Sequence, residues 1–151
     1  MTGRKKRSLK WKLKRNGRYC LLKENNGVLA DTSIWIEFFK SRSDIGNKLE
    51  KLIKENSVWT CGIVLFESVQ GTKTDYEKST ITGILSNLKY VEMTQFLWKK
   101  AGELSGSLKR KGLNLPLSDI IVAGIAIEHN LKIFTLDKHF GQIPGVKPYK
   151  M

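Results

Sequence analysis

Short apolar runs alternate along the chain with longer segments in which apolar residues recur every three or four positions. The short runs are typical of buried strands, and the longer segments are typical of helices with one face in the core. We predict strands over residues 28–30, 57–60, 90–93 and 132–135, with a short edge strand over 146–149. Strands that alternate with helices predict an α/β fold with a mostly parallel sheet covered on both faces.

Several residues mark where the predicted helices begin. Ser33 is placed to cap the first helix, and either Ser43 or Asp44 to cap the second. Thr94 is placed to open the longest helix. Ser118 is expected to cap a helix that is apolar almost all round, which therefore belongs in the core.

Length and composition indicate one globular domain. The chain has 151 residues, of which 40% are hydrophobic and 27% charged, enough for a hydrophobic core. No apolar run approaches the roughly 20 residues that a membrane-spanning helix needs, and no secretory signal is recognisable, so the expected location is the cytoplasm. Cys20 and Cys61 lack the spacing of metal ligands, and His129 and His139 are expected at the surface.

The net charge of +13 is concentrated at the N-terminus. Residues 1–26 carry +9, and residues 27–151 carry +4. A basic arm of this kind indicates binding to nucleic acid or another polyanion. We expect residues 1–26 to be a poorly ordered extension, or the product of a gene start placed too far upstream, and residues 27–151 to form the domain.

Four acidic residues stand at positions that bring them to one edge of the predicted sheet. Asp31 and Asp137 follow strands, Glu67 lies on an apolar helix face, and Asp119 lies in the first turn of the apolar helix. Each has a structural explanation by itself: a helix cap or turn for the first two, a long-range ion pair or partial exposure for Glu67, and the helix dipole for Asp119. Together they would repel one another, and the ordinary solution is a divalent cation with oxygen ligands, Mg²⁺ or Mn²⁺. In a basic protein this arrangement indicates phosphodiester chemistry.

The segments around these acids resemble the four motifs of PIN-domain nucleases, in the order of the family. The resemblance rests on residues 29–36, on Glu67 four residues before Gly71, and on residues 117–126 and 134–140. Size and motifs are most similar to the VapC toxins of prokaryotic toxin–antitoxin pairs. The basic extension is a departure, since typical members lack it.

The resemblance implies a three-layer α/β/α PIN-like fold with four to five mostly parallel strands. It also implies an endoribonuclease that depends on Mg²⁺ or Mn²⁺, acts on an RNA substrate, forms a homodimer and is inhibited by a cognate antitoxin. The acidic positions of the family carry over to this chain. Asp31 and Asp119 would bind metal directly, Glu67 directly or through water while orienting the attacking water, and Asp137 more peripherally or at a second metal.

Other residues are expected to assist this site. By the same resemblance, Ser33 and Thr135 would be hydroxyls that orient the carboxylates. Lys109, Arg110 and Lys111 close the long helix one loop before the third motif. They are candidates for contact with RNA phosphates, and an alternative is that they complement the helix dipole.

Two other functions are alternatives to the nuclease. One is a non-catalytic PIN-like RNA-binding module that uses the basic N-terminal arm. The acidic quartet favours the enzyme, because a pure binder gains nothing from negative charge beside RNA. The other is a phosphoacceptor signalling domain, which would need paired acids after the first strand, whereas Asp31 is followed by Thr32 and Ser33.

Overall fold

The computed structural model of the chain describes residues 10–13, 19–22, 26–40 and 43–151. Strands β1 (Lys10–Leu13) and β2 (Tyr19–Leu22) pair as an antiparallel hairpin apart from the main sheet. The prediction that residues 1–26 are poorly ordered or a gene-start artefact falls largely outside the described residues and stays a prediction.

The main sheet has five parallel strands in the order β5-β4-β3-β6-β7. They are β3 (Val28–Ala30), β4 (Val58–Cys61), β5 (Lys89–Val91), β6 (Lys132–Phe134) and β7 (Lys147–Pro148). In the central register, Val28 lies opposite Val58 on one side and Lys132 on the other. The predicted fold class is confirmed, with small shifts at the ends of the strands.

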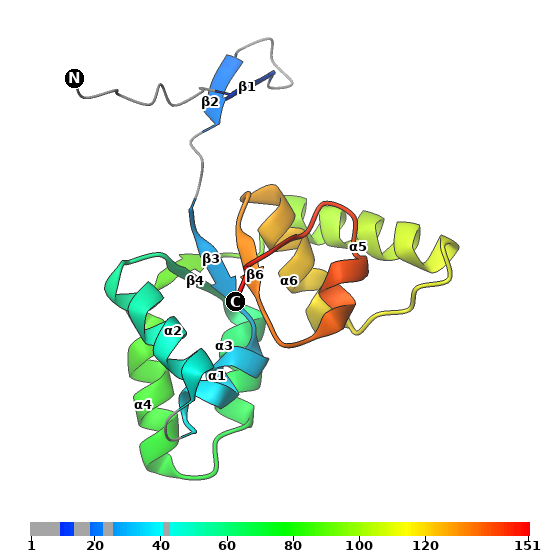
Figure 1. The fold of residues 1–151 in the computed structure, drawn as a ribbon. Helices are drawn as coiled ribbons and strands as arrows, with labels where there is room; N and C mark the ends of the chain where they lie inside the picture. The colour runs from blue at the N-terminus through cyan, green and yellow to red at the C-terminus, as the bar shows by residue number, and fades with distance from the viewer. Residues whose placement is uncertain (1–9, 14–18, 23–25, 41–42) are drawn as a thin grey trace, which may run out of the picture.

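Seven helical segments connect these strands: α1 (Thr32–Phe38), α2 (Asp44–Lys54), α3 (Gly62–Gln70), α4 (Asp75–Ser86), α5 (Gln95–Arg110), α6 (Leu117–Glu128) and the 3₁₀ helix η1 (Lys138–Gln142). The chain moves outward from β3 to β4 and β5, and then returns past β3 to β6. Because crossovers between parallel strands are right-handed, the two directions place α1 to α4 on one face and α5 and α6 on the other. Figure 1 shows α1, α2 and α4 to one side of the strands, and α5 and α6 to the other.

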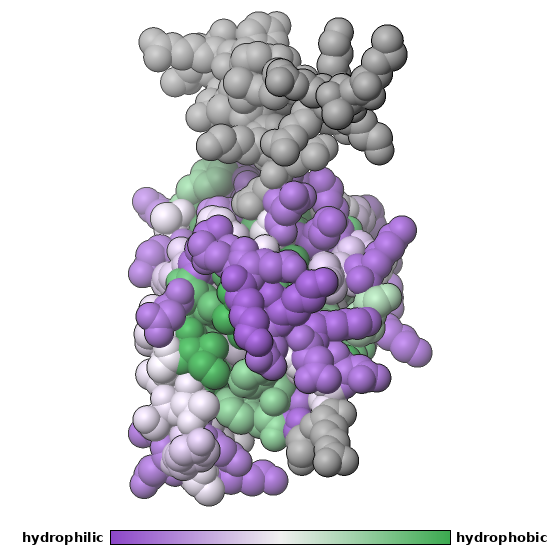
Figure 2. Space-filling model, turned by 60° about the vertical axis from the view of Figure 1, so that its left-hand side comes forward, coloured by the Kyte–Doolittle hydropathy of each residue, from purple (hydrophilic) through white to green (hydrophobic). Residues whose placement is uncertain are grey.

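The core lies on both faces of β3, the central strand. Val28, Leu29 and Ala30 are all buried, as parallel strands covered on both faces require. Helix α6 is buried at every position from 120 to 126, which confirms that it is a core helix. On the face drawn in Figure 2, hydrophilic side chains cover most of the surface and a smaller apolar area lies among them. Within the described part of the chain, no helix has the length and apolar character needed to cross a membrane.

Two of the predicted helix caps are wrong. Helix α1 begins at Thr32 with Asp31 at its N-cap, so Ser33 lies inside the helix, where its hydroxyl donates to Asp31. Helix α6 begins at Leu117 after Pro116, so Ser118 also lies inside its first turn. The other caps are confirmed, since the side chains at 43 and 94 each accept a hydrogen bond from the backbone three residues on.

Gly27 marks a close approach at the start of β3. A Cβ built on Gly27 would lie 2.4 Å from Nε1 of Trp59 and 2.6 Å from Cδ2 of Leu131. We expect Gly27→Ala to lower the free energy of unfolding by about 1–3 kcal/mol, because the site has no room for a methyl group. The matched control is Gly83→Ala in α4, where a Cβ meets nothing within 4 Å and should stabilise by about 0.5–1 kcal/mol. Urea unfolding of both variants checks this, and a Gly27→Ala variant as stable as wild type would contradict it.

Candidate functional site

The predicted acids lie where the direction of the chain across the sheet reverses. β3 and β6 are adjacent parallel strands, and their crossovers lie on opposite faces of the sheet. Such a switch point leaves a crevice outside the carboxyl ends of the two strands, where α/β proteins bind their ligands. Asp31 directly follows β3, and Asp137 follows β6 by three residues. The backbone N–H of Asp31 donates to the carbonyl of Phe134 at 2.9 Å, which joins the two strand ends.

The Asp31 carboxylate is buried and held by two hydroxyl groups. Its side chain belongs to one of the few buried polar residues of the described chain. Its Oδ2 accepts hydrogen bonds from the Ser33 hydroxyl at 2.9 Å and the Thr135 hydroxyl at 2.9 Å. Two hydrogen bonds to one oxygen fix the orientation of the carboxylate. Both donors act on one oxygen, so Oδ1 keeps its lone pairs for another partner.

The same two hydroxyls also fix the loop after β6. Ser33 Oγ accepts from the backbone N–H of Leu136 at 3.1 Å, and Thr135 Oγ1 accepts from that of Asp137 at 2.9 Å. Each hydroxyl therefore accepts a hydrogen bond from the loop and donates one to Asp31. The orientation of Asp31 and the path of the loop that carries Asp137 are coupled through these bonds.

Glu67 reaches the crevice from α3, the helix that follows β4. Its Oε2 accepts a hydrogen bond from the Thr32 hydroxyl at 2.8 Å, and its side chain is half-buried. The long-range ion pair weighed for Glu67 is not found among the residues that the structure describes. Thr32 was not singled out as a partner of Glu67, because the two residues lie 35 positions apart in the sequence.

Asp119 shows that the four acids share one electrostatic environment. Its pKa is raised from 3.8 to about 6, first by burial and then by the negative charges of Asp137 and Asp31, with a smaller contribution from Glu67. His139 opposes this shift. The side chain of Asp119 is 14% exposed, and its Oδ2 has no hydrogen-bond partner within the described residues. A buried carboxylate oxygen without a donor is stabilised either by protonation, which the raised pKa favours, or by a nearby positive charge.

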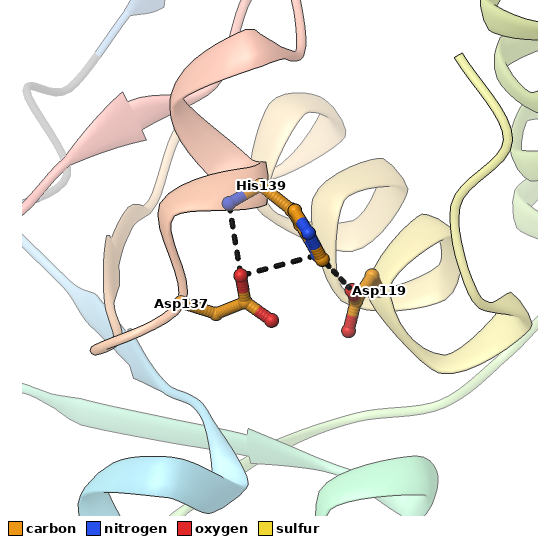
Figure 3. A group of neighbouring side chains, drawn as sticks. All are labelled: Asp119, Asp137 and His139. Carbon is orange, nitrogen blue, oxygen red and sulfur yellow. Dashed lines mark hydrogen bonds and ion pairs between the residues drawn. The ribbon is translucent and has the colours of Figure 1, made fainter.

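Asp137 and His139 complete the cluster on the other side of Asp119. Asp137 caps η1, and its Oδ1 accepts from the backbone N–H of His139 at 2.9 Å. Nδ1 of His139 lies 3.2 Å from that oxygen and 3.8 Å from Oδ2 of Asp119 (Figure 3). The ring is exposed, as the sequence indicated, but its contact with two of the acids was missed. The only signal was its place two residues after Asp137.

The residues present fit a divalent cation. Asp119, Asp137 and His139 offer ligand atoms that all lie within 4.8 Å of one another, and one oxygen of Asp119 lacks a donor. Carboxylate oxygens are the ligands that Mg²⁺ and Mn²⁺ prefer. The roles of the four acids as metal ligands, and of Ser33 and Thr135 as their supports, stay predictions that this geometry favours.

The predicted RNA-binding residues lie apart from this cluster. Lys109 and Arg110 form the last turn of α5, Lys111 is its C-cap, and all three are exposed. No contact between them and the four acids is found in the described structure. Both interpretations of these residues, phosphate contact and complement to the helix dipole, stay open.

A groove borders the acidic cluster between α1, α3 and α4. It has a volume of about 450 Å³, and Thr32 and Glu67 form the end nearest the cluster. Its wall on α1 is apolar and includes Trp35, Ile36 and Phe39, of which Ile36 is 58% and Phe39 40% exposed. A partner that filled this groove would lie against the Thr32–Glu67 pair.

Comparisons with known proteins all point to one family. Residues 28–146 match the family model of the PIN domain. Ribonuclease VapC2 of Rickettsia felis is 30% identical over 124 residues, which cover 78% of this chain and 92% of that protein. Ribonuclease VapC11 of Mycobacterium tuberculosis is 23% identical over 124 residues, covering 79% of this chain and 92% of that protein.

Solved structures agree with these sequences. The VapBC2 structure from Rickettsia felis, bound to a DNA fragment from the promoter, superposes with a TM-score of 0.71 at 28% identity and covers 82% of this chain and 98% of that chain. A toxin–antitoxin complex from Klebsiella pneumoniae superposes with a TM-score of 0.66 at 27% identity, covering 83% of this chain and 100% of that chain.

The raised pKa of Asp119 predicts how the stability of the metal-free protein depends on pH. Between pH 3.8 and about 6 the folded protein holds the Asp119 proton more tightly than the unfolded chain does, so stability falls as pH rises through this window. We expect Asp119→Asn, measured in EDTA at pH 7.5, to raise the free energy of unfolding by about 1 kcal/mol, allowing for partial solvent screening. This corresponds to about 3 °C in melting temperature.

The gain in the free energy of unfolding of Asp119→Asn should disappear at pH 4, where Asp119 of the wild type is largely protonated in the folded state. Glu92→Gln is the control, since it removes an exposed acid outside the cluster and should leave the melting temperature nearly unchanged at both pH values. A variant at 119 that is less stable than wild type at pH 7.5 in EDTA would contradict the electrostatic explanation.

Proposed function

The chain belongs to the PIN domain family, and on this premise we propose that it is a metal-dependent endoribonuclease, the toxin of a toxin–antitoxin pair. The observation that carries the proposal is the convergence of four carboxylates at the switch point of the sheet, where three of them raise the pKa of Asp119. Such a concentration of like charge has a use if a Mg²⁺ or Mn²⁺ ion is held there. The ribonuclease relatives support RNA as the substrate.

The geometry supports a distinct role for each acid. Asp31, oriented by its two hydroxyl donors, and Asp119, with its unpartnered oxygen, would hold the ion directly. Asp137 would hold it from the other side or support a second ion. When bound, the ion would lower the pKa of a water ligand and neutralise charge on the phosphate oxygens.

Glu67 is suited to handle the attacking water. Thr32 occupies Oε2 of Glu67, which fixes the carboxylate and leaves Oε1 to accept a proton from water. Lys109, Arg110 and Lys111 are exposed cations for the flanking RNA phosphates. Phosphate contacts of this kind position the RNA without reading its sequence, so they would set affinity and its dependence on salt.

The groove beside Glu67 supports a protein partner. The Rickettsia felis and Klebsiella pneumoniae structures are complexes of toxin with antitoxin. We therefore propose that this chain has a cognate antitoxin, and that the antitoxin covers the groove. Apolar side chains of the antitoxin would pack on the exposed Ile36 and Phe39. The same contact would cover the end of the groove where Glu67 lies, which couples antitoxin binding to loss of activity.

A homodimer remains a prediction from the family resemblance. Helix α5 offers surface that association would bury, because Phe96 is 53% and Trp98 51% exposed. Exposed aromatic side chains are enriched at contact surfaces. Sedimentation of the purified protein decides between one and two copies.

A non-catalytic RNA-binding module that uses the basic arm is the alternative. It predicts RNA binding that depends on residues 1–26 and no cleavage under any metal condition. The cluster argues against it, because carboxylates at the ligand crevice would repel phosphate unless a cation compensates them.

The test of the proposed function is RNA cleavage by wild type and Asp31→Asn. We expect wild type to cleave RNA in Mg²⁺ or Mn²⁺ and to stop in EDTA, and Asp31→Asn to lose at least about 100-fold in rate, a loss of roughly 3 kcal/mol of transition-state stabilisation. Gel analysis of a labelled RNA pool measures this. The control is Asp75→Asn, an exposed acid on α4 outside the cluster. Equal cleavage by the Asp31 variant, or cleavage that survives EDTA, would rule out the metal nuclease.

The antitoxin surface has its own test. We expect Ile36→Asp to weaken binding of the co-expressed antitoxin by at least about tenfold, because a charge is then buried in an apolar contact. RNA cleavage by the isolated variant should be unchanged. Tyr90→Asp changes an exposed aromatic residue on the edge strand β5, outside the groove, and serves as the control for binding. Calorimetric titration measures both, and full affinity of the Ile36 variant would show that the antitoxin binds elsewhere.

A further inference from the structure

One imidazole lies among the acids, and the roles assigned above leave it unused. His139 presents Nδ1 to Oδ1 of Asp137 at 3.2 Å and to Oδ2 of Asp119 at 3.8 Å (Figure 3). The oxygen of Asp119 that it approaches is the one without a hydrogen-bond partner in the described residues. The nitrogen and the two carboxylates therefore converge on a common point, and they come from two separate elements, η1 and α6.

The spacing of these atoms suits ligands of a single ion. Two ligands bound at about 2.1 Å to one octahedral ion stand about 3.0 Å apart when adjacent and about 4.2 Å apart when opposite. Both distances from Nδ1 of His139 lie between these limits.

The position of His139 is fixed by its surroundings. Its backbone N–H donates to Asp137, and the next residue, Phe140, is buried in the core with 2% exposure. The ring itself is about half exposed, with a side-chain exposure of 52%, so an ion can reach its nitrogen from solvent without disturbing the core. A held backbone and an accessible ring are what a ligand residue needs.

We propose that His139 is a ligand of the metal ion, beside Asp119 and Asp137, and that its nitrogen gives this part of the site a preference for Mn²⁺ over Mg²⁺. The proposal rests on the metal-dependent function proposed above and adds a ligand and a selectivity to it. Mg²⁺ binds oxygen almost alone, whereas imidazole suits transition metals. The part of the cluster formed by Asp31 and Glu67 offers only oxygen, so the two parts differ in the ions they favour.

The competing explanation is that His139 is only a cationic partner of the two acids. In that case it would compensate charge without binding an ion, and its nitrogen would carry a proton directed at Asp137. The two explanations differ in one observable, which is whether a ring nitrogen is bonded to the metal.

Pulsed electron paramagnetic resonance of bound Mn²⁺ makes this distinction on the full chain. We expect wild type to show the ¹⁴N modulation of a coordinated imidazole, replaced by the ¹⁵N pattern when histidine is labelled. The modulation should be lost in His139→Gln and kept in His129→Gln, which changes the other histidine of the chain. The affinity for Mn²⁺ in His139→Gln should fall by about tenfold or more, and that for Mg²⁺ by less than about twofold.

The outcomes separate the two proposals. Mn²⁺ bound by wild type without ¹⁴N modulation, or modulation that persists in His139→Gln, overturns the role of His139 and leaves the nuclease intact. A wild-type protein that binds no Mn²⁺ and cleaves no RNA overturns both. Thermal melting of His139→Gln in EDTA should match wild type within about 2 °C, since an exposed ring contributes little to stability.

Discussion

The burial of Asp119 beside three other carboxylates is the main physical constraint on this structure. Asp31, Glu67, Asp119 and Asp137 come from four different elements, and the effect of three of them on the pKa of the fourth shows that they act at one place. Holding them there opposes folding in the absence of a cation. The fold tolerates it because the elements that carry them are anchored in the core by buried apolar residues, on β3 and α6 above all. Stability comes from the scaffold, and the repulsion is what a cation relieves.

Three hydroxyl groups fix the orientation of two of these carboxylates. Ser33 and Thr135 brace one oxygen of Asp31, and Thr32 braces one oxygen of Glu67. Among the described residues no hydroxyl donates to the other oxygen of either carboxylate. The hydrogen bonds therefore orient each carboxylate and leave one of its oxygens available as a ligand atom. The residues at 33 and 135 also accept from the loop after β6, which ties the position of Asp137 to that of Asp31. A site whose members support one another in this way is oriented before an ion or substrate arrives.

The sequence predicted most of what depends on local pattern. The apolar run of β3, the buried helix α6 and the acids at strand ends follow from periodicity and from the edge that parallel strands share. It did not predict what depends on contacts between distant residues. Ser33 resembles a helix cap in sequence, but its hydroxyl is used by Asp31 and by the loop 103 positions away. The contact of His139 with Asp119 depends on how η1 packs against α6, which no local signal encodes.

The charge of the chain and the charge of the crevice are opposite, and this difference gives the acids their function. A net charge of +13, of which residues 1–26 carry +9, attracts a polyanion from a distance. At the crevice the sign reverses, so a phosphate that arrives there is repelled unless a divalent ion lies between it and the carboxylates. The metal ion proposed for this site would therefore make RNA binding depend on metal binding. An antitoxin that fills the groove beside Glu67 would close the crevice to the substrate and leave the scaffold unchanged.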